Sequence, residues 1–245
     1  MCHIFSFFYR YMHALLFCML MILMSSSALQ AGSDSAPPAS YTSIAAYHRS
    51  IPRINNILSL KHLTFGSPIF IRIFKLENEL ELWIQDEHEY KLYKTYIICF
   101  KSGKLGPKLR EGDRQSPEGF YVVGHDQMNP WSDFHLAFNL GYPNDYDLFY
   151  NRSGSALMIH GRCSSDGCFA MTDYYMDEIY TLVHEALARN QIQFQVHIFP
   201  FRLNEKNIKD HQNSPWYSFW SNLKEGYDFF EYYQIPPLIS VLNGL

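Results

Sequence analysis

Three stretches rich in β-branched and aromatic residues, 68–76, 79–84 and 90–100, constrain the fold of this chain more than any other feature. In the first stretch, isoleucine occupies every second position from 69 to 73, and a period of two is typical of a strand. Glu77 and Asn78 have the character of a tight turn between the first and second stretches. We therefore expect a β-hairpin here, and a domain that is built largely from strands.

The rest of the chain adds further strands and two kinds of helix. Strands are expected at 120–123, 157–160 and 193–201. The clearest helical pattern runs from 173 to 189, where apolar residues recur on one face behind a capping residue and an acidic first turn. A second helix is expected at 216–225, and the aromatic cluster at 227–233 is interpreted as packing of the C-terminal segment.

Two further segments interrupt the regular pattern. Residues 42–62 carry apolar side chains at near-helical spacing but contain Pro52, so we expect a broken amphipathic helix. Residues 101–119 are rich in Gly, Pro and charge, which predicts a long loop. Long loops in compact domains are often functional.

Composition and charge narrow the class of protein. The chain has 245 residues, of which 47% are hydrophobic and 18% charged, enough for one medium globular domain with a full core. The formal net charge is -4, and Lys and Arg are scattered along the sequence, so there is no electrostatic footprint for nucleic acid. Nucleic-acid binding is excluded on this basis.

The first 31 residues differ from the rest of the chain. Arg10 precedes an apolar run at 14–24 and then small residues, which is typical of a signal peptide. The run is shorter than the roughly 20 residues that span a bilayer, although an uncleaved membrane anchor is the alternative. We expect the mature chain to lie outside the cytoplasm, with a linker and an N-terminal helix at 32–64.

Removal of the signal would leave three cysteines, Cys99, Cys163 and Cys168. In an oxidising compartment an odd number leaves at least one thiol free or paired with another chain. The segment 157–171 concentrates two of these cysteines together with His160 and two glycines. Seven residues separate His160 from Cys168, and a loop of that length allows the imidazole to accept the thiol proton.

Three other interpretations of this segment stay open on spacing alone. The first is a local disulfide between Cys163 and Cys168 in a non-catalytic binding or structural module, the second is zinc bound by both cysteines and His160, and the third is a buried, inert pair of thiols. Zinc is the weakest of these, because the candidate fourth ligands His125, His135 and His197 show no matching spacing. We therefore expect no metal site.

Two blocks of sequence resemble a known family. His160-Gly161 is followed by Ser165-Asp-Gly167-Cys168 and preceded by the run Ser-Pro-Glu-Gly-Phe-Tyr at 116–121. This combination resembles the catalytic domain of the L,D-transpeptidases, the YkuD-type fold, over roughly residues 65–200. The segments 105–121 and 135–144 more narrowly resemble the YafK-like branch of Gram-negative bacteria. The resemblance implies an α+β, mainly β fold with a few packed helices.

The resemblance also implies a mechanism without a cofactor. Cys168 would attack the peptidoglycan stem peptide at meso-diaminopimelate and form a thioester, and His160, oriented by the carbonyl of Gly161, would move the proton. Gly167 and Ser165 would support the loop and the oxyanion site. For the YafK-like branch the implied reaction is hydrolysis, in the periplasm, of the link between peptidoglycan and an outer-membrane lipoprotein.

Two departures from the family pattern affect these expectations. The gap between histidine and cysteine is short, and Ala170 stands where most members have Arg. Loss of that Arg leaves the contacts to substrate and acceptor open, so cross-linking or lipoprotein attachment by transfer is the alternative reaction. His135 and Tyr121 are further candidates for the substrate groove. The expected organisation is a catalytic domain at 65–203 and a helical, aromatic extension at 204–245.

Overall fold

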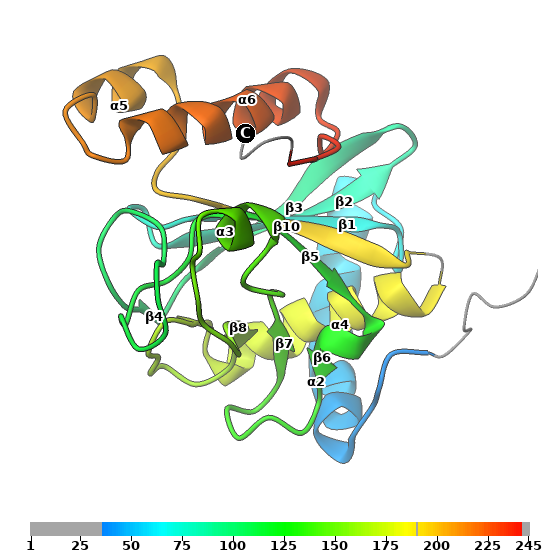
Figure 1. Cartoon of the computed structure of the whole chain (residues 1–245). Coiled ribbons are helices and arrows are strands. Elements are labelled where there is room, and N and C mark those ends of the chain that lie inside the picture. The colour runs from blue at the N-terminus through cyan, green and yellow to red at the C-terminus, as the bar shows by residue number, and fades with distance from the viewer. Residues whose placement is uncertain (1–35, 190, 242–245) are drawn as a thin grey trace, which may run out of the picture. The chain divides into compact units, whose positions relative to one another are not determined.

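Two β-sheets form the centre of the structure, a computed structural model that describes residues 36–189 and 191–241 (Figure 1). The expected signal peptide at 1–31 lies outside the described residues. The first sheet has the order β3-β2-β1-β10-β5, and its strands are β1 (Ile69–Phe74), β2 (Glu79–Asp86), β3 (Glu89–Ile97), β5 (Gly119–Gly124) and β10 (Gln193–Phe199). The second sheet has the order β4-β9-β8-β7-β6, and its strands are β4 (Phe100–Lys101), β6 (Met128–Asn129), β7 (Ala137–Asn139), β8 (Met158–His160) and β9 (Phe169–Ala170).

The expected hairpin is confirmed by the pairing of β1 with β2, which is antiparallel with Phe74 opposite Glu79. Asn78 closes the turn at a φ of 55°, a left-handed conformation that Asn tolerates better than most residues. One expectation was wrong: the stretch 90–100 is not a single strand. β3 ends at Ile97, and Phe100 begins β4 in the other sheet, because the backbone changes partner at Cys99, whose N–H donates to the Ala170 carbonyl (2.8 Å).

Strand β1 is buried on both faces of the first sheet, and it carries a different kind of side chain on each. Ile71 and Ile73 belong to the larger core cluster, with residues of the helices α2 (Tyr41–Lys61) and α4 (Asp173–Arg189). Phe74 belongs to a second cluster with residues of α6 (Tyr217–Tyr233). Figure 1 accordingly shows α2 and α4 on one side of this sheet and α6 on the other. The alternation of isoleucine and phenylalanine in β1 therefore reflects two separate cores, one on each side of the strand.

The expected break in the first helix was wrong, because α2 runs from Tyr41 to Lys61 with Pro52 inside it. A proline in a helix interior costs about 3 kcal/mol or more. Contacts on both sides of Pro52 offset this cost: Arg49 pairs with Asp177 (2.8 Å) and Arg53 with Glu178 (2.7 Å), both on α4. Tertiary packing thus overrides the local signal.

The other helices follow the pattern more closely. α4 spans Asp173–Arg189, as expected, whereas α6 extends to Tyr233, so the aromatic cluster lies within a helix that was expected to end at 225. Two short helices, α3 (Asp145–Phe149) and α5 (Glu205–Asp210), precede it. Residues from 204 onward belong to the same compact unit as the sheets. Within the described ranges, no helix is both long and apolar enough to cross a bilayer.

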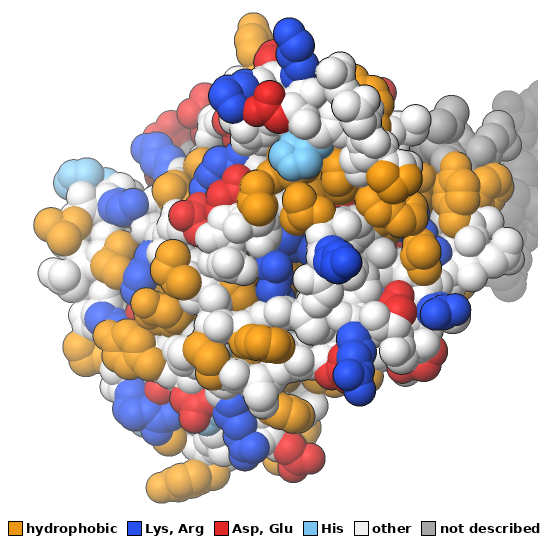
Figure 2. Space-filling view, turned by 90° about the vertical axis from the view of Figure 1, so that its left-hand side faces the viewer, with side chains coloured by type: hydrophobic (Ala, Val, Ile, Leu, Met, Phe, Trp, Pro, Cys, Tyr) orange, Lys and Arg blue, Asp and Glu red, His pale blue; other side chains and the backbone are white. Residues whose placement is uncertain are grey.

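Basic and acidic side chains mix on the face of the molecule that lies to the left in Figure 1. Figure 2 shows this face, where Lys and Arg side chains are interspersed with Asp, Glu and hydrophobic ones. A nucleic-acid-binding surface would gather cations in one patch or stripe. On this face the cations do not gather in one patch.

Candidate active site

Cys168 and His160 come from neighbouring segments of the second sheet. β8, which ends at His160, pairs in parallel with β9, which begins directly after Cys168; Ile159 lies opposite Phe169 and His160 opposite Ala170. The backbone N–H of Met158, two residues before His160 on β8, donates to Cys168 Sγ (3.3 Å). The pairing of these two strands therefore brings the thiol to the strand that carries the imidazole.

The imidazole of His160 has a defined tautomer. The side chain is 4% exposed, and Nδ1 lies 2.6 Å from the carbonyl oxygen of Gly161. Because a carbonyl only accepts, Nδ1 carries the hydrogen and Nε2 keeps its lone pair. The ring of Phe134 packs against the imidazole of His160, with the two ring centroids 4.8 Å apart. Burial lowers the pKa of His160 below the ordinary value of 6.5, so the ring is a neutral base at pH 7.

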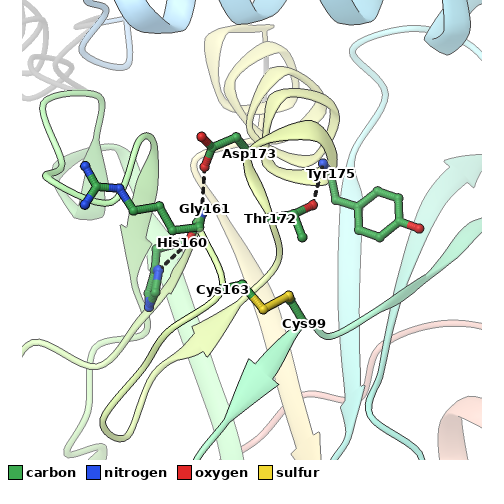
Figure 3. The surroundings of a disulfide bond; sticks show 8 residues. Cys99, His160, Gly161, Cys163, Thr172, Asp173 and Tyr175 are labelled. Carbon is green, nitrogen blue, oxygen red and sulfur yellow. Dashed lines mark hydrogen bonds between the residues drawn. A yellow bond between two sulfur atoms is a disulfide. The ribbon is translucent and has the colours of Figure 1, made fainter.

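Glycine is needed at position 161 because there is no space for a side chain. A Cβ there would lie 2.7 Å from Asp173 Oδ1, 2.8 Å from the His135 Cβ and 2.8 Å from the carbonyl oxygen of Phe134. Figure 3 shows how Gly161 lies between His160 and Asp173. The glycine therefore allows β8 to end against two neighbouring segments while its carbonyl holds the imidazole. This is the contact that the family resemblance implied.

The sulfur of Cys168 is a free, half-buried thiol. The backbone N–H of Met158 donates to Sγ (3.3 Å), and Sγ lies 3.6 Å from the Ala156 carbonyl oxygen, to which the S–H donates. Burial raises the pKa of the Cys168 thiol above the ordinary 9.0. The resting site therefore holds a thiol and a neutral imidazole, and His160 must remove the proton during attack.

This resting state predicts a particular pH dependence. The pKa of His160 is lowered, so the base stays neutral, and kcat/KM should hold, down to pH 6.5 and fall only below it. The pKa of Cys168 is raised, so its alkylation by iodoacetamide should keep rising with pH up to 9.0. Stopped-time alkylation followed by mass spectrometry measures the second profile. A plateau near pH 7 would contradict the assignment, because it would indicate a preformed thiolate–imidazolium pair.

The turn before Cys168 is fixed by hydroxyl groups. Gly167 has a φ of +100°, which glycine adopts without strain, and its N–H donates to Ser102 Oγ (2.6 Å). Ser165 Oγ donates to the carbonyl oxygen of Cys168 (2.8 Å). Gly167 and Ser165 thus support the loop, as the resemblance implied, but the N–H of Gly167 is already engaged by Ser102. An oxyanion would need other donors.

A disulfide joins Cys99 to Cys163, with the two Cα atoms 5.3 Å apart (Figure 3). The alternative of a Cys163–Cys168 disulfide was therefore wrong. The bond ties the chain just before β4 to the loop between His160 and Cys168, and it leaves Cys168 as the unpaired thiol among these three. A five-residue spacing made the local pairing look favourable; β-sheet pairing instead brings Cys99 close from a separation of 64 residues.

Removing this disulfide should destabilise the fold. Closing a loop of this length contributes about 4 kcal/mol in the chain-entropy model. We expect the double variant Cys99→Ser, Cys163→Ser to lose roughly that free energy of unfolding in urea titration. Cys168→Ser, which keeps the bond, is the matched control and should stay near the wild type. An unchanged midpoint in the double variant would show that the bond is absent in solution.

The two candidates for the substrate groove lie elsewhere. Tyr121 is 1% exposed, and its hydroxyl donates to Asp147 Oδ2 (3.0 Å), so it is a core residue, and the expected role in binding substrate was wrong. His135 is largely buried and pairs through Nε2 with Asp177 of α4 (2.6 Å). Its Cβ abuts Gly161, which makes it part of the wall behind the base. The alternation of strand β5 already favoured an inward Tyr121.

Several buried charges around the site were missed by sequence reasoning. Lys108, in the loop that was expected at 101–119, is 3% exposed and donates to Asp113 Oδ1 (2.6 Å). Lys75 and Glu118 form a buried ion pair.

Among the described residues no three His, Cys, Asp or Glu side chains gather as metal ligands. A cavity of 480 Å³ lies between β5, α6 and residues 237–241, and neither catalytic candidate lines it.

The comparison with protein families defines the class of this protein. The model of the L,D-transpeptidase catalytic domain family, YkuD, matches residues 71–198, just over half of the chain and the span that holds both sheets. The chain belongs to the L,D-transpeptidase family and is a peptidoglycan-modifying enzyme. The fold, which combines two five-stranded β-sheets with several helices, agrees with this membership.

Particular relatives refine the comparison. The protein named "Putative L,D-transpeptidase YafK" from Escherichia coli is 47% identical over 184 residues, which cover 75% of each chain. Among solved structures, the helical cell shape determining protein Pgp2 from Campylobacter jejuni aligns with 21% identity and a TM-score of 0.43, covering 60% of this chain and 55% of that one. A mutant of the same protein gives 19% identity and a TM-score of 0.46, covering 76% and 64%.

Proposed function

We propose that this enzyme cleaves the bond between the peptidoglycan stem peptide and an outer-membrane lipoprotein by way of a thioester on Cys168. The observation that carries the proposal is the free thiol of Cys168, hydrogen-bonded to β8 through the Met158 N–H (3.3 Å), the strand that ends at His160, whose Nδ1 is held by the Gly161 carbonyl (2.6 Å). A nucleophile, a base and a group that orients the base are the parts that acyl transfer requires. Supporting it further, the chain belongs to a peptidoglycan-modifying family.

The proposed reaction has two halves. His160 Nε2 takes the thiol proton as Sγ of Cys168 bonds to the carbonyl carbon at meso-diaminopimelate; the amide C–N bond then breaks, and the imidazolium returns the proton to the leaving amine. In the second half, His160 removes a proton from water as the water oxygen attacks the thioester carbon. The C–S bond breaks and the thiolate regains its proton, which restores the resting site.

The residue two positions after the nucleophile favours water over a second peptide as the acceptor. Most family members were expected to carry Arg where this chain has Ala170, which is fully buried on β9. A methyl group there offers no charge to an acceptor carboxylate. The name of the Escherichia coli relative contains transpeptidase, so transfer is the alternative reaction and an explicit outcome of the test.

Peptidoglycan sacculi that carry bound lipoprotein test the proposal directly. After incubation with the full chain, we expect free lipoprotein in the supernatant and no product with Cys168→Ala. New cross-links between diaminopimelate residues would instead establish transfer. If neither product appears, the substrate assignment is wrong. Fractionation of cells, with the N-terminus of the mature chain read by mass spectrometry, tests the proposed periplasmic location and the use of 1–31 as an export signal.

A further inference from the structure

A fully buried ion pair lies beneath the long loop that follows β4. Lys75, just after β1, is 0% exposed and Glu118, just before β5, is 1% exposed; Nζ and Oε1 are 3.0 Å apart. Lys75 also donates to the carbonyl oxygens of Gly106 (2.8 Å) and Ser116 (2.9 Å). All three ammonium donors are therefore satisfied. Burying such a pair without full hydrogen bonding would cost several kcal/mol, so its geometry is tightly defined.

This pair clamps both ends of residues 102–118. Near the beginning, the N–H of Gly106 donates to Glu118 Oε1 (2.7 Å). Near the end, the carbonyl of Ser116 accepts from Lys75. The side-chain amide of Gln115 bridges the two ends by donating to the Gly106 carbonyl (2.7 Å). The loop is thus held as a rigid segment, although its Gly, Pro and charge content predicted an irregular one.

The clamped loop contacts the catalytic segment at two points. Ser102 Oγ accepts from the N–H of Gly167 (2.6 Å), and Ser116 Oγ lies 3.5 Å from the carbonyl oxygen of Cys168, to which it donates. Ser102 and Ser116 are themselves joined, because the N–H of Ser116 donates to the Ser102 carbonyl (3.2 Å). A shift of the loop therefore moves the backbone that carries the thiol.

The remaining carboxylate oxygen of Glu118 is bound by a residue outside the matched family span. Trp220 on α6 is 2% exposed and donates from Nε1 to Glu118 Oε2 (2.8 Å). Its ring packs edge-on against Phe201 at 5.2 Å. We propose that Trp220 is a positioning residue: through Glu118 and the clamped loop, the C-terminal helix sets the position of Cys168 for attack. The inference rests on the proposed role of Cys168 as nucleophile.

The variant Trp220→Phe tests this by removing the indole N–H while keeping an aromatic ring. We expect kcat on lipoprotein-bearing sacculi to fall about tenfold with KM within about twofold, because misplacement of a nucleophile acts on the chemical step. Alkylation of Cys168 by iodoacetamide at pH 7.5 should become at least about threefold faster, because a looser loop exposes the thiol and moves its pKa down toward the ordinary value.

The matched control is Trp83→Phe. Trp83 also donates its indole N–H to a carboxylate, Glu81 Oε2 (3.0 Å), but it lies on β2 outside the loop network. It should leave the kcat and the alkylation rate within about twofold of the wild type. Equal effects of Trp220→Phe and Trp83→Phe on both readouts would overturn the inference, since general loss of stability would then explain them.

The variant Ser116→Ala adds a test that does not depend on how well Trp220→Phe folds. It removes one oxygen and the contact to the Cys168 carbonyl, so alkylation should again become faster, and an unchanged rate would overturn the inference. Combined with Trp220→Phe, its effect should be non-additive, whereas additive effects would show independent action. Alkylation needs no substrate, so these results stand even if the wild type releases nothing from sacculi and the proposed function fails.

Discussion

Replacing Cys168 by alanine is expected to lower turnover of peptidoglycan by at least about 10³-fold while leaving the fold intact. Without sulfur no thioester forms, and His160 is left without a proton to remove. The structural cost is small, because Sγ is half-buried and its hydrogen bonds with the Met158 N–H (3.3 Å) and the Ala156 carbonyl (3.6 Å) are long. Product release from sacculi, together with a thermal unfolding curve, separates loss of chemistry from loss of fold.

Intact mass spectrometry sharpens this test. Wild-type protein sampled early in the reaction should carry the mass of the acyl peptide, and that adduct should disappear on treatment with hydroxylamine, which cleaves thioesters. Cys168→Ala should carry no adduct. Cys168→Ser, which keeps a side chain of similar size and replaces the thiol with a hydroxyl group, controls for packing. Product release by the alanine variant at a rate near that of the wild type would exclude the thioester route.

Local patterns in the sequence predicted the elements whose own residues determine them. The isoleucine alternation in β1 and the apolar stripe of α4 were confirmed, because each pattern matches the period of its element and each element buries that face. The isoleucine spacing alone did not show that β1 is covered on both sides. The phenylalanines between the isoleucines were the available signal, since Phe70 and Phe74 are as buried as the isoleucines in the structure.

Features that depend on distant partners could not be predicted from local sequence. Cys163 pairs with Cys99 rather than with Cys168, because β4 and β9 run side by side and bring Cys99 to the catalytic loop. Pro52 lies in an unbroken helix because packing of the buried face of α2, together with ion pairs to α4, offsets its cost. In both cases a contact across the fold outweighs a spacing along the chain.

In the candidate site, too, local sequence predicted some residues and missed those that depend on distant partners. The choice of His160 and Cys168 as base and nucleophile followed from two motifs that flank a short loop. The supports did not, because Ser102 and Glu118 reach the catalytic turn through a loop whose Gly and Pro content predicted irregular structure, and Trp220 comes from a helix near the C-terminus. A lysine directly after an apolar strand, such as Lys75, was the one available signal of a buried ion pair.

The variant His160→Gln is expected to lower kcat by about 10²- to 10⁴-fold, the range for loss of a general base. Glutamine keeps a polar side chain of similar reach but has no basic nitrogen. The matched control is His125→Gln: His125 Nε2 also binds a backbone carbonyl, that of Leu187 (3.0 Å), but from the first sheet's side of the molecule. Its turnover should stay within about threefold of the wild type.

The same variant distinguishes two ways of activating the thiol. Burial raises the pKa of Cys168, and the charges that act on it come from Asp166 and Lys108, so the resting thiol owes little to the imidazole. Alkylation of Cys168 in His160→Gln should therefore proceed within about threefold of the wild-type rate although turnover collapses. If alkylation fell in parallel with turnover, His160 would be stabilising a thiolate at rest. Because the two rates separate proton removal during attack from ionisation before it, their ratio identifies the role of His160.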